Sequence, residues 1–230
     1  MSFRTTVSAF IVFSCSAVCL GEEPKTPSPV QNVDAVEALK RIQEGNARFA
    51  AGESKHPHET KVWRASLEAD QHPFAVVLGC ADSRVSPGIV LDQGLGDLFV
   101  VRVAGNVVDT NVTASVEYAI DHLNTQLILI MGHTHCGAVT ATYDYLADVE
   151  GEPAEVVSLL YRIEPAFTGL PDDLPRQQQI DLAISRNVRL SVRRLSRVPD
   201  LRRRINSGKI KIVGAVYDMH TGKLQILDDQ

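Results

Sequence analysis

Four short apolar runs mark this chain, and they constrain its fold more than any other feature. Each is rich in β-branched residues and is too short for a typical buried helix. Nearly continuous apolar runs of this length are typical of strands buried on both faces, as in a parallel sheet covered by helices. The runs are FAVVLG (74–79), LFVVRV (98–103), QLILIMG (126–132) and IKIVGAVY (210–217).

Segments with helical spacing of apolar residues alternate with these runs. The first extends from a capping residue, Asp34, to a terminating glycine, Gly52, and Leu39 and Ile42 belong to its apolar face. Further helices are predicted over 110–123, 137–149 and 177–198. Strands that alternate with helices predict an α/β fold with a mainly parallel sheet flanked by helices.

The N-terminus has a different composition from the rest of the chain. A basic start is followed by residues 7–20, which carry no charge and are mostly apolar. This is the layout of an export signal, and the run is short for a membrane span of about 20 residues. We expect a signal peptide over 1–21, a proline-rich linker over 22–33, and one domain over 34–230 in a periplasmic or secreted protein. The alternatives are an uncleaved anchor and lipidation at Cys15 or Cys19.

The overall charge argues against nucleic acid or an anionic membrane as a partner. The formal net charge is -5, and 44% of the residues are hydrophobic. Arginines are frequent between 189 and 204, but apolar residues interleave with them, which is typical of an amphipathic helix with a solvated basic face. We therefore expect no nucleic-acid binding and no membrane span in the mature chain.

Two motifs place reactive side chains at the ends of predicted strands. GCADSRVSPG (79–88) follows the first run, and MGHTHCGAV (131–139) ends the third. In open α/β sheets, active sites lie beyond the carboxyl ends of the strands. Two strand ends could therefore deliver these side chains to one crevice. The residues are Cys80, Asp82, Arg84, His133 and Cys136.

Two thiolates, an imidazole and a carboxylate suit a tetrahedral zinc site. Cys80, His133 and Cys136 fill three positions, which leaves the fourth for water or for Asp82. Arg84 is a charge partner that could hold Asp82 away from the metal, so that the carboxylate accepts a hydrogen bond from zinc-bound water. Taken singly, each residue has an ordinary structural explanation, and a dithiol redox pair of Cys80 and Cys136 is a further alternative.

The two motifs resemble the signatures of the beta-class carbonic anhydrases. The resemblance is carried by GCADSRVS (79–86) and GHTHCGA (132–138) and extends over about residues 34–228. It implies the beta-carbonic-anhydrase fold and one Zn²⁺ per subunit, bound by Cys80, His133 and Cys136. It also implies reversible hydration of CO2 to bicarbonate and a proton, through attack of zinc-bound hydroxide on CO2, with Asp82 and Arg84 as the catalytic pair.

The resemblance further implies a substrate pocket and an assembly. Gln71, Phe99 and Tyr118 match the pocket residues of the plant-like subgroup, in which the Asp stays off the metal. The other subgroup has Trp where this chain has Val77, and there Asp82 would be a fourth ligand in a closed state. The family forms dimers or tetramers, with active sites at the dimer interface and the N-terminal helix packed on the partner subunit.

Two questions stay open at the level of sequence. The same fold and zinc chemistry could serve a hydrolase of carbonyl sulfide or carbon disulfide, or a non-catalytic zinc-binding member. His135 lies between two expected ligands, where the family usually has small residues. It is a candidate proton shuttle, a competing ligand, or a partly exposed histidine with no role in the reaction.

Overall fold

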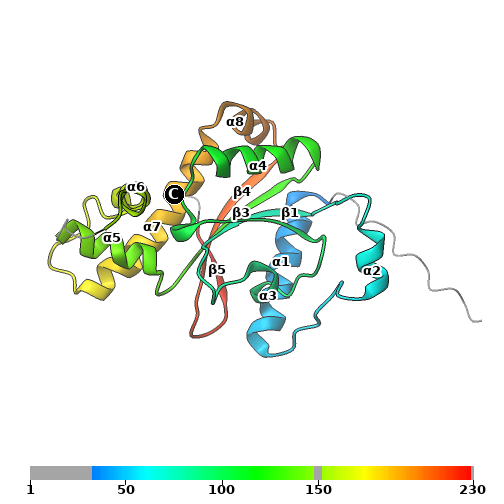
Figure 1. Ribbon diagram of the computed structural model, residues 1–230, viewed down its shortest axis with the longest axis horizontal. Helices are drawn as coiled ribbons and strands as arrows, with labels where there is room; N and C mark the ends of the chain where they lie inside the picture. Colours follow the sequence, from blue (N-terminus) through cyan, green and yellow to red (C-terminus); the bar gives the residue numbers. More distant parts are fainter. Residues whose placement is uncertain (1–32, 148–151, 229–230) are drawn as a thin grey trace, which may run out of the picture.

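A five-stranded sheet forms the centre of the molecule in the computed structural model, which describes residues 33–147 and 152–228 (Figure 1). The strand order is β2-β1-β3-β4-β5, with β1 to β4 parallel and β5 antiparallel to β4. The predicted signal peptide and nearly all of the predicted linker lie outside the described residues. The strands are β1 (Ala75–Gly79), β2 (Leu98–Arg102), β3 (Leu127–His133), β4 (Lys211–Tyr217) and β5 (Leu224–Ile226).

The predicted strands are confirmed within one or two residues, but the expected burial of one is wrong. Every residue of β1 and β3 is buried, as their apolar sequences require. In contrast, β2 lies at an edge of the sheet, and its Val100 is 42% exposed. An edge strand lacks one neighbour, so its apolar side chains stay partly open within a single chain.

Helices cover both faces of the sheet. Helix α1 contacts α3 and β3 on one face, and α7 lies against β3 and β4 on the other (Figure 1). Of the eight helices in the described ranges, α2, α3, α6 and α8 were not individually predicted. The eight are α1 (Ala35–Ala51), α2 (Lys61–Ser66), α3 (Pro87–Val90), α4 (Thr110–His122), α5 (Gly137–Ala147), α6 (Ala154–Ile163), α7 (Arg176–Ser196) and α8 (Pro199–Asn206).

The ends of the helices follow local sequence signals. The Asp34 carboxylate accepts hydrogen bonds from the first free N–H groups of α1, and Gly52 ends the helix with φ of 73°. The arginine-rich region is divided between two helices, because Pro199 begins α8. No helix in the described part of the chain is long and apolar enough to cross a membrane.

Two glycines let α7 approach the sheet closely. A Cβ at Gly132 in β3 would lie 2.5 Å from Val188 of α7, and a Cβ at Gly214 in β4 would lie 2.9 Å from the same side chain. These distances are shorter than carbon–carbon contact, so any larger residue would push α7 outward. The glycines therefore fix the depth at which α7 sits on the sheet.

The buried side chain of Asn46 connects α1 to two distant segments. Its Nδ2 donates to the carbonyls of Val90 and Gly222, each at 2.9 Å, and its Oδ1 accepts from the N–H of Leu224 at 2.7 Å. Only 5% of Asn46 is exposed. The amide thus satisfies three backbone groups that would otherwise be buried without partners.

Replacing Asn46 with alanine should therefore lower the free energy of unfolding by about 2–3 kcal/mol, because it leaves backbone groups unpaired. Urea denaturation at fixed protein concentration measures the change. Asn111→Ala is the matched control, because that side chain is exposed on α4, and it should change stability by less than about 0.5 kcal/mol. Equal stability of the two variants would contradict the argument.

Candidate metal centre

Cys80, His133 and Cys136 meet at the carboxyl ends of two neighbouring strands. The last residue of β1, Gly79, pairs with Met131 of β3, so Cys80 and His133 emerge side by side. Cys136 follows three residues later, immediately before α5. The three potential ligand atoms lie within 4.8 Å of one another, and the two sulfurs are 4.0 Å apart.

The His133 ring is oriented as a metal ligand requires. Its Nδ1 donates to the Thr134 carbonyl at 2.9 Å, which fixes the tautomer that leaves a lone pair on Nε2. That Nε2 atom is buried and has no hydrogen-bond partner in the described structure. A buried polar atom without a partner is costly, and a metal ion facing it would remove that cost.

The paired thiols also favour a cation between them. The hydrogen bond from the Cys136 thiol, opposed by burial, holds the pKa of Cys80 well below its ordinary value, and the backbone N–H groups of Asp82 and Gly105 add to this effect. The pKa of Cys136 is raised, because it gives its hydrogen bond to Cys80, is buried, and would form a second negative charge beside the first. One thiolate therefore forms readily, whereas two require a positive charge.

The spacing of the sulfurs fits zinc. In a tetrahedral site with Zn–S bonds of about 2.3 Å, two sulfurs lie about 3.8 Å apart. The observed 4.0 Å is close to this value. Among the residues that the structure describes, the group consists of two thiols and one imidazole without a fourth protein ligand, which matches the donor set of a zinc site that keeps one position open.

Asp82 is held by Arg84 at the edge of this group. The guanidinium donates from Nε to Oδ1 at 2.9 Å and from Nη2 to Oδ2 at 2.6 Å. These hydrogen bonds hold the pKa of the Asp82 carboxyl well below its usual range, although partial burial opposes the shift. Oδ2 lies 4.0 Å from His133 Nε2, so the carboxylate borders the place where an ion would sit.

Two residues of the surrounding loops were not identified from the sequence. Arg102, at the end of β2, donates to the carbonyls of Cys80 and Asp82 at 2.9 and 2.6 Å and so fixes the loop between them. The N–H of Gly105 donates to the Cys80 sulfur at 3.3 Å. Their distances from Cys80 along the chain hide both contacts, and only the pairing of β1 with β2 creates them.

The predicted pocket residues lie apart from this group within one chain. Phe99 and Tyr118 contact each other, with ring centroids 6.2 Å apart. Phe99 pairs with Val76, whereas the end of β1 pairs with Arg102, so Phe99 lies three positions before the metal end of the sheet. Gln71 is exposed before β1. In the described part of the chain, no hydrogen bond joins any of the three to the Cys80–His133–Cys136 group.

His135 is exposed beside the centre and has a positive φ of 55°. Its backbone carbonyl accepts a hydrogen bond from Arg84 Nη2 at 3.2 Å, so this residue helps to position the guanidinium. The imidazole of His135 is not among the grouped ligand atoms. The geometry therefore gives its backbone a clear contact, and its side chain is open to solvent.

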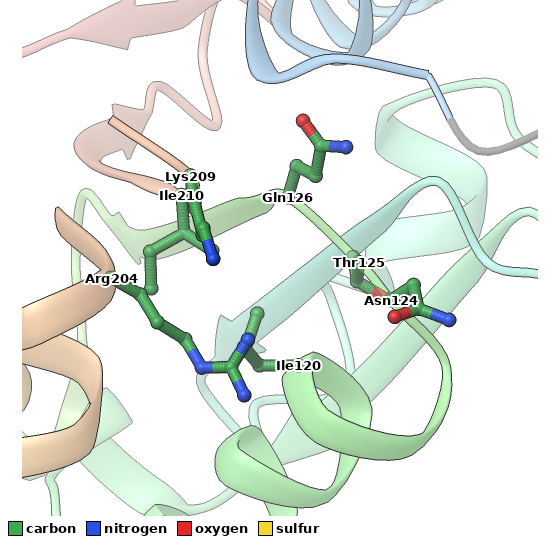
Figure 2. Close-up of a pocket in the computed structure, with 7 residues that line it drawn as sticks. All are labelled: Ile120, Asn124, Thr125, Gln126, Arg204, Lys209 and Ile210. Atoms are coloured by element: carbon green, nitrogen blue, oxygen red, sulfur yellow. The ribbon is translucent and has the colours of Figure 1, made fainter. Parts of the chain in front are cut away.

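A separate hollow of about 340 Å³ lies at the opposite end of the sheet (Figure 2). Its residues precede β3 and β4, whereas the metal group follows β3, which places the two about 20 Å apart at 3.3 Å per strand residue. Its arginine is already paired with Asp121. The hollow is lined by Ile120, Asn124, Thr125, Gln126, Arg204, Lys209 and Ile210.

Comparison with known proteins gives one consistent family. The sequence profile described as carbonic anhydrase matches residues 75–224. Carbonic anhydrase 2 of Mycobacterium tuberculosis is 41% identical over 199 residues, which cover 86% of this chain and 95% of that protein. Beta carbonic anhydrase 3 of Arabidopsis thaliana is 30% identical over 202 residues, covering 83% of this chain and 77% of that protein.

The fold agrees with the sequence comparison. The solved structure of the beta-carbonic anhydrase CcaA superimposes with a TM-score of 0.68 at 25% identity, covering 84% of this chain and 93% of that one. The profile match runs from the start of β1 to the first residue of β5 and includes all three grouped ligands. On these grounds the chain belongs to the beta class of the carbonic anhydrase family.

Proposed function

We propose that the chain catalyses the reversible hydration of CO2 to bicarbonate and a proton at a Zn²⁺ ion bound by Cys80, His133 and Cys136. The observation that carries this proposal is the buried Nε2 of His133, which lacks a partner and faces two sulfurs 4.0 Å apart. When bound there, zinc would act as a Lewis acid that lowers the pKa of a coordinated water to about 7.

Asp82 would act on the protons of the reacting water. Arg84 lowers the pKa of Asp82, so the carboxylate is ionised at neutral pH and accepts a hydrogen bond through Oδ2. That bond would orient the water and aim its lone pair at CO2. The bidentate contact holds the carboxylate in one orientation, which is the role we assign to Arg84.

The same contact supports the plant-like, open form of the site. Both carboxylate oxygens of Asp82 are engaged by Arg84, and Asp82 is not a member of the grouped ligands. A closed form would require Asp82 to leave Arg84. Val77, which stands where the other subgroup has Trp, is fully buried in β1.

The substrate pocket would be completed by a partner subunit. The free edge of β2 exposes Val100, and nearby Tyr118 is 48% exposed. A second copy docked at this edge could bring its Gln71, Phe99 and Tyr118 to the metal centre. Helix α1, whose Val36 is 74% exposed, would pack on the partner as well. We propose a homodimer, or a tetramer of two such dimers.

Export of the protein is also our proposal. It rests on the uncharged segment 7–20 and the proline-rich segment that follows it. On this view residues 34–230 form the enzyme domain, and removal of 1–21 leaves Cys80 and Cys136 as its cysteines. Bound zinc would protect these thiols in an oxidising compartment.

Asp82→Asn should reduce the CO2 hydration rate by about 10²–10⁴-fold. The uncharged amide would be a weaker hydrogen-bond acceptor for the reacting water than the carboxylate. Stopped-flow hydration and the zinc content of each sample measure the effect. Asp181→Asn, at an exposed acid on α7, is the matched control. An unchanged rate in Asp82→Asn would exclude the assigned role, and an inactive wild-type enzyme with full zinc would exclude the function.

Val100→Glu should convert the dimer to a monomer and abolish hydration while zinc stays bound, because the interface would bury a charge without a partner. Light scattering gives the mass, and metal analysis gives the zinc content. Val156→Glu, at a partly exposed valine of α6, is the control and should leave both mass and activity unchanged. A fully active monomer would show that the pocket is complete within one chain.

Removing the metal with a chelator should abolish activity, and mild oxidation should then join Cys80 to Cys136. The sulfurs are 4.0 Å apart and need to approach by about 2 Å to form a disulfide. Peptide mapping by mass spectrometry identifies the bridge. Zinc-loaded protein treated identically should keep both thiols. Free thiols at both positions after oxidation of the metal-free protein would contradict this prediction.

A further inference from the structure

Two buried polar side chains of α7 bind the loop that touches the metal group. Asn187 is 1% exposed, and its Nδ2 donates to the Gly105 carbonyl at 2.7 Å. Ser191, one turn later, is fully buried, and its Oγ donates to the Asn106 carbonyl at 3.0 Å. Helix α7 therefore donates hydrogen bonds to the carbonyls of two successive residues, which lie more than 80 residues earlier in the sequence.

The loop bound by these two side chains, Gly105–Asn106, has an uncommon backbone conformation. Gly105 has φ of 66°, and Asn106, which has a side chain, has φ of 44°. Two consecutive residues in the left-handed region are unfavourable unless the surroundings hold them. The same loop aims the N–H of Gly105 at the Cys80 sulfur, 3.3 Å away.

We propose that Asn187 and Ser191 are positioning residues of the metal centre, which hold the Gly105–Asn106 turn so that the Gly105 N–H donates to the Cys80 thiolate. The inference rests on the proposed function, in which that thiolate binds zinc. Neither side chain is a member of the grouped ligands. Both act through the backbone of the turn.

The packing around the turn leaves it little freedom to adjust. A Cβ at Gly105 would lie 2.6 Å from Ile163 and 3.2 Å from Ala138, so the turn is enclosed by α6 and α5. On the far side, the contact of Val188 with Gly132 and Gly214 sets the position of α7. Asn187 is the next residue to Val188, so the depth of the helix places its amide at the turn.

A hydrogen bond to a thiolate changes its bond to a metal. The N–H draws electron density from the sulfur and lowers the energy of its lone pairs. Residues outside the ligand set that fix a ligand's orientation affect metal affinity about 10–100-fold. Loss of the hydrogen bonds from Asn187 and Ser191 should let the turn relax and lengthen the contact from the Gly105 N–H to the Cys80 sulfur. The result should be measurable at the metal itself.

The test replaces zinc with Co²⁺ in the full-length protein and compares wild type with Ser191→Ala and Asn187→Ala. We expect the sulfur-to-cobalt charge-transfer band to move to lower energy in both variants, because the thiolate lone pairs rise in energy. Zinc affinity, measured by competition with a chelator, should fall by about 10-fold or more, because the released turn no longer fixes the position of the Cys80 ligand. Ser191→Ala removes a single hydroxyl and decides the result alone if Asn187→Ala does not fold.

Two controls separate positioning from general stability. Ser196→Ala removes another α7 hydroxyl, which donates to Val192 within the helix, and should leave the band and the affinity unchanged. Asn46→Ala is less stable by the argument given above, but Asn46 bonds Val90, Gly222 and Leu224 rather than the Gly105–Asn106 turn, so its cobalt spectrum should match wild type. A shift in Asn46→Ala equal to that in Ser191→Ala would overturn the proposal.

The remaining outcomes are distinguishable. Wild-type spectra and wild-type zinc affinity in folded Ser191→Ala would overturn the positioning role and leave the proposed function intact. The absence of any sulfur-to-cobalt band in the wild-type protein would instead remove the metal site, and the proposed function with it.

Discussion

The parallel pairing of β1 with β3 is the constraint on which the centre depends. Because Gly79 lies opposite Met131, Cys80 and His133 lie at the carboxyl ends of two adjacent strands. Successive side chains of a strand point to opposite faces, so a slip of one residue would turn Cys80 away from His133. The fully buried apolar residues of both strands oppose that slip, since it would place them against different neighbours. Core packing thus sets the position of the reactive groups.

Electrostatics then determines which ligand the carboxyl ends of β1 and β3 can bind. Two buried thiols beside an imidazole nitrogen without a partner form a site that is unfavourable when empty and favourable around a cation. Asp82 could add another negative charge, but Arg84 engages both of its oxygens. The arginine therefore keeps the carboxylate ionised and available for a hydrogen bond. The three ligands and the Asp–Arg pair have separate electrostatic tasks although they share one crevice.

The sequence predicted features with a local signature and missed those created by folding. Apolar runs identified four strands, Asp34 and Gly52 marked the ends of α1, and the two motifs named the residues that meet at the centre. The edge position of β2 could not be predicted, because its apolar run resembles that of a central strand. Arg102 and Asn187 were missed because strand pairing and helix docking bring them to their partners. Phe99 and Tyr118 contact each other, yet one chain does not bring them to the metal group, and their place in a substrate pocket stays a prediction.

Helix α7 links the stability of the core to the accuracy of the centre through two neighbouring rows of residues. Val188 and Val192 form an apolar row that packs at Gly214, and Asn187 and Ser191 form a polar row that binds the turn at Gly105. Each row has a spacing of four, so both face consistently along one helix. The apolar row stabilises the packing of α7 on the sheet, since it removes apolar surface from water. The polar row contributes less free energy to the packing of α7 on the sheet, because the net free energy of a buried hydrogen bond is small. Its hydrogen bonds are directional, however, so they fix the orientation of the Gly105 and Asn106 carbonyls. A close helix-to-sheet contact at two glycines is therefore a physical requirement for the hydrogen bond that reaches Cys80.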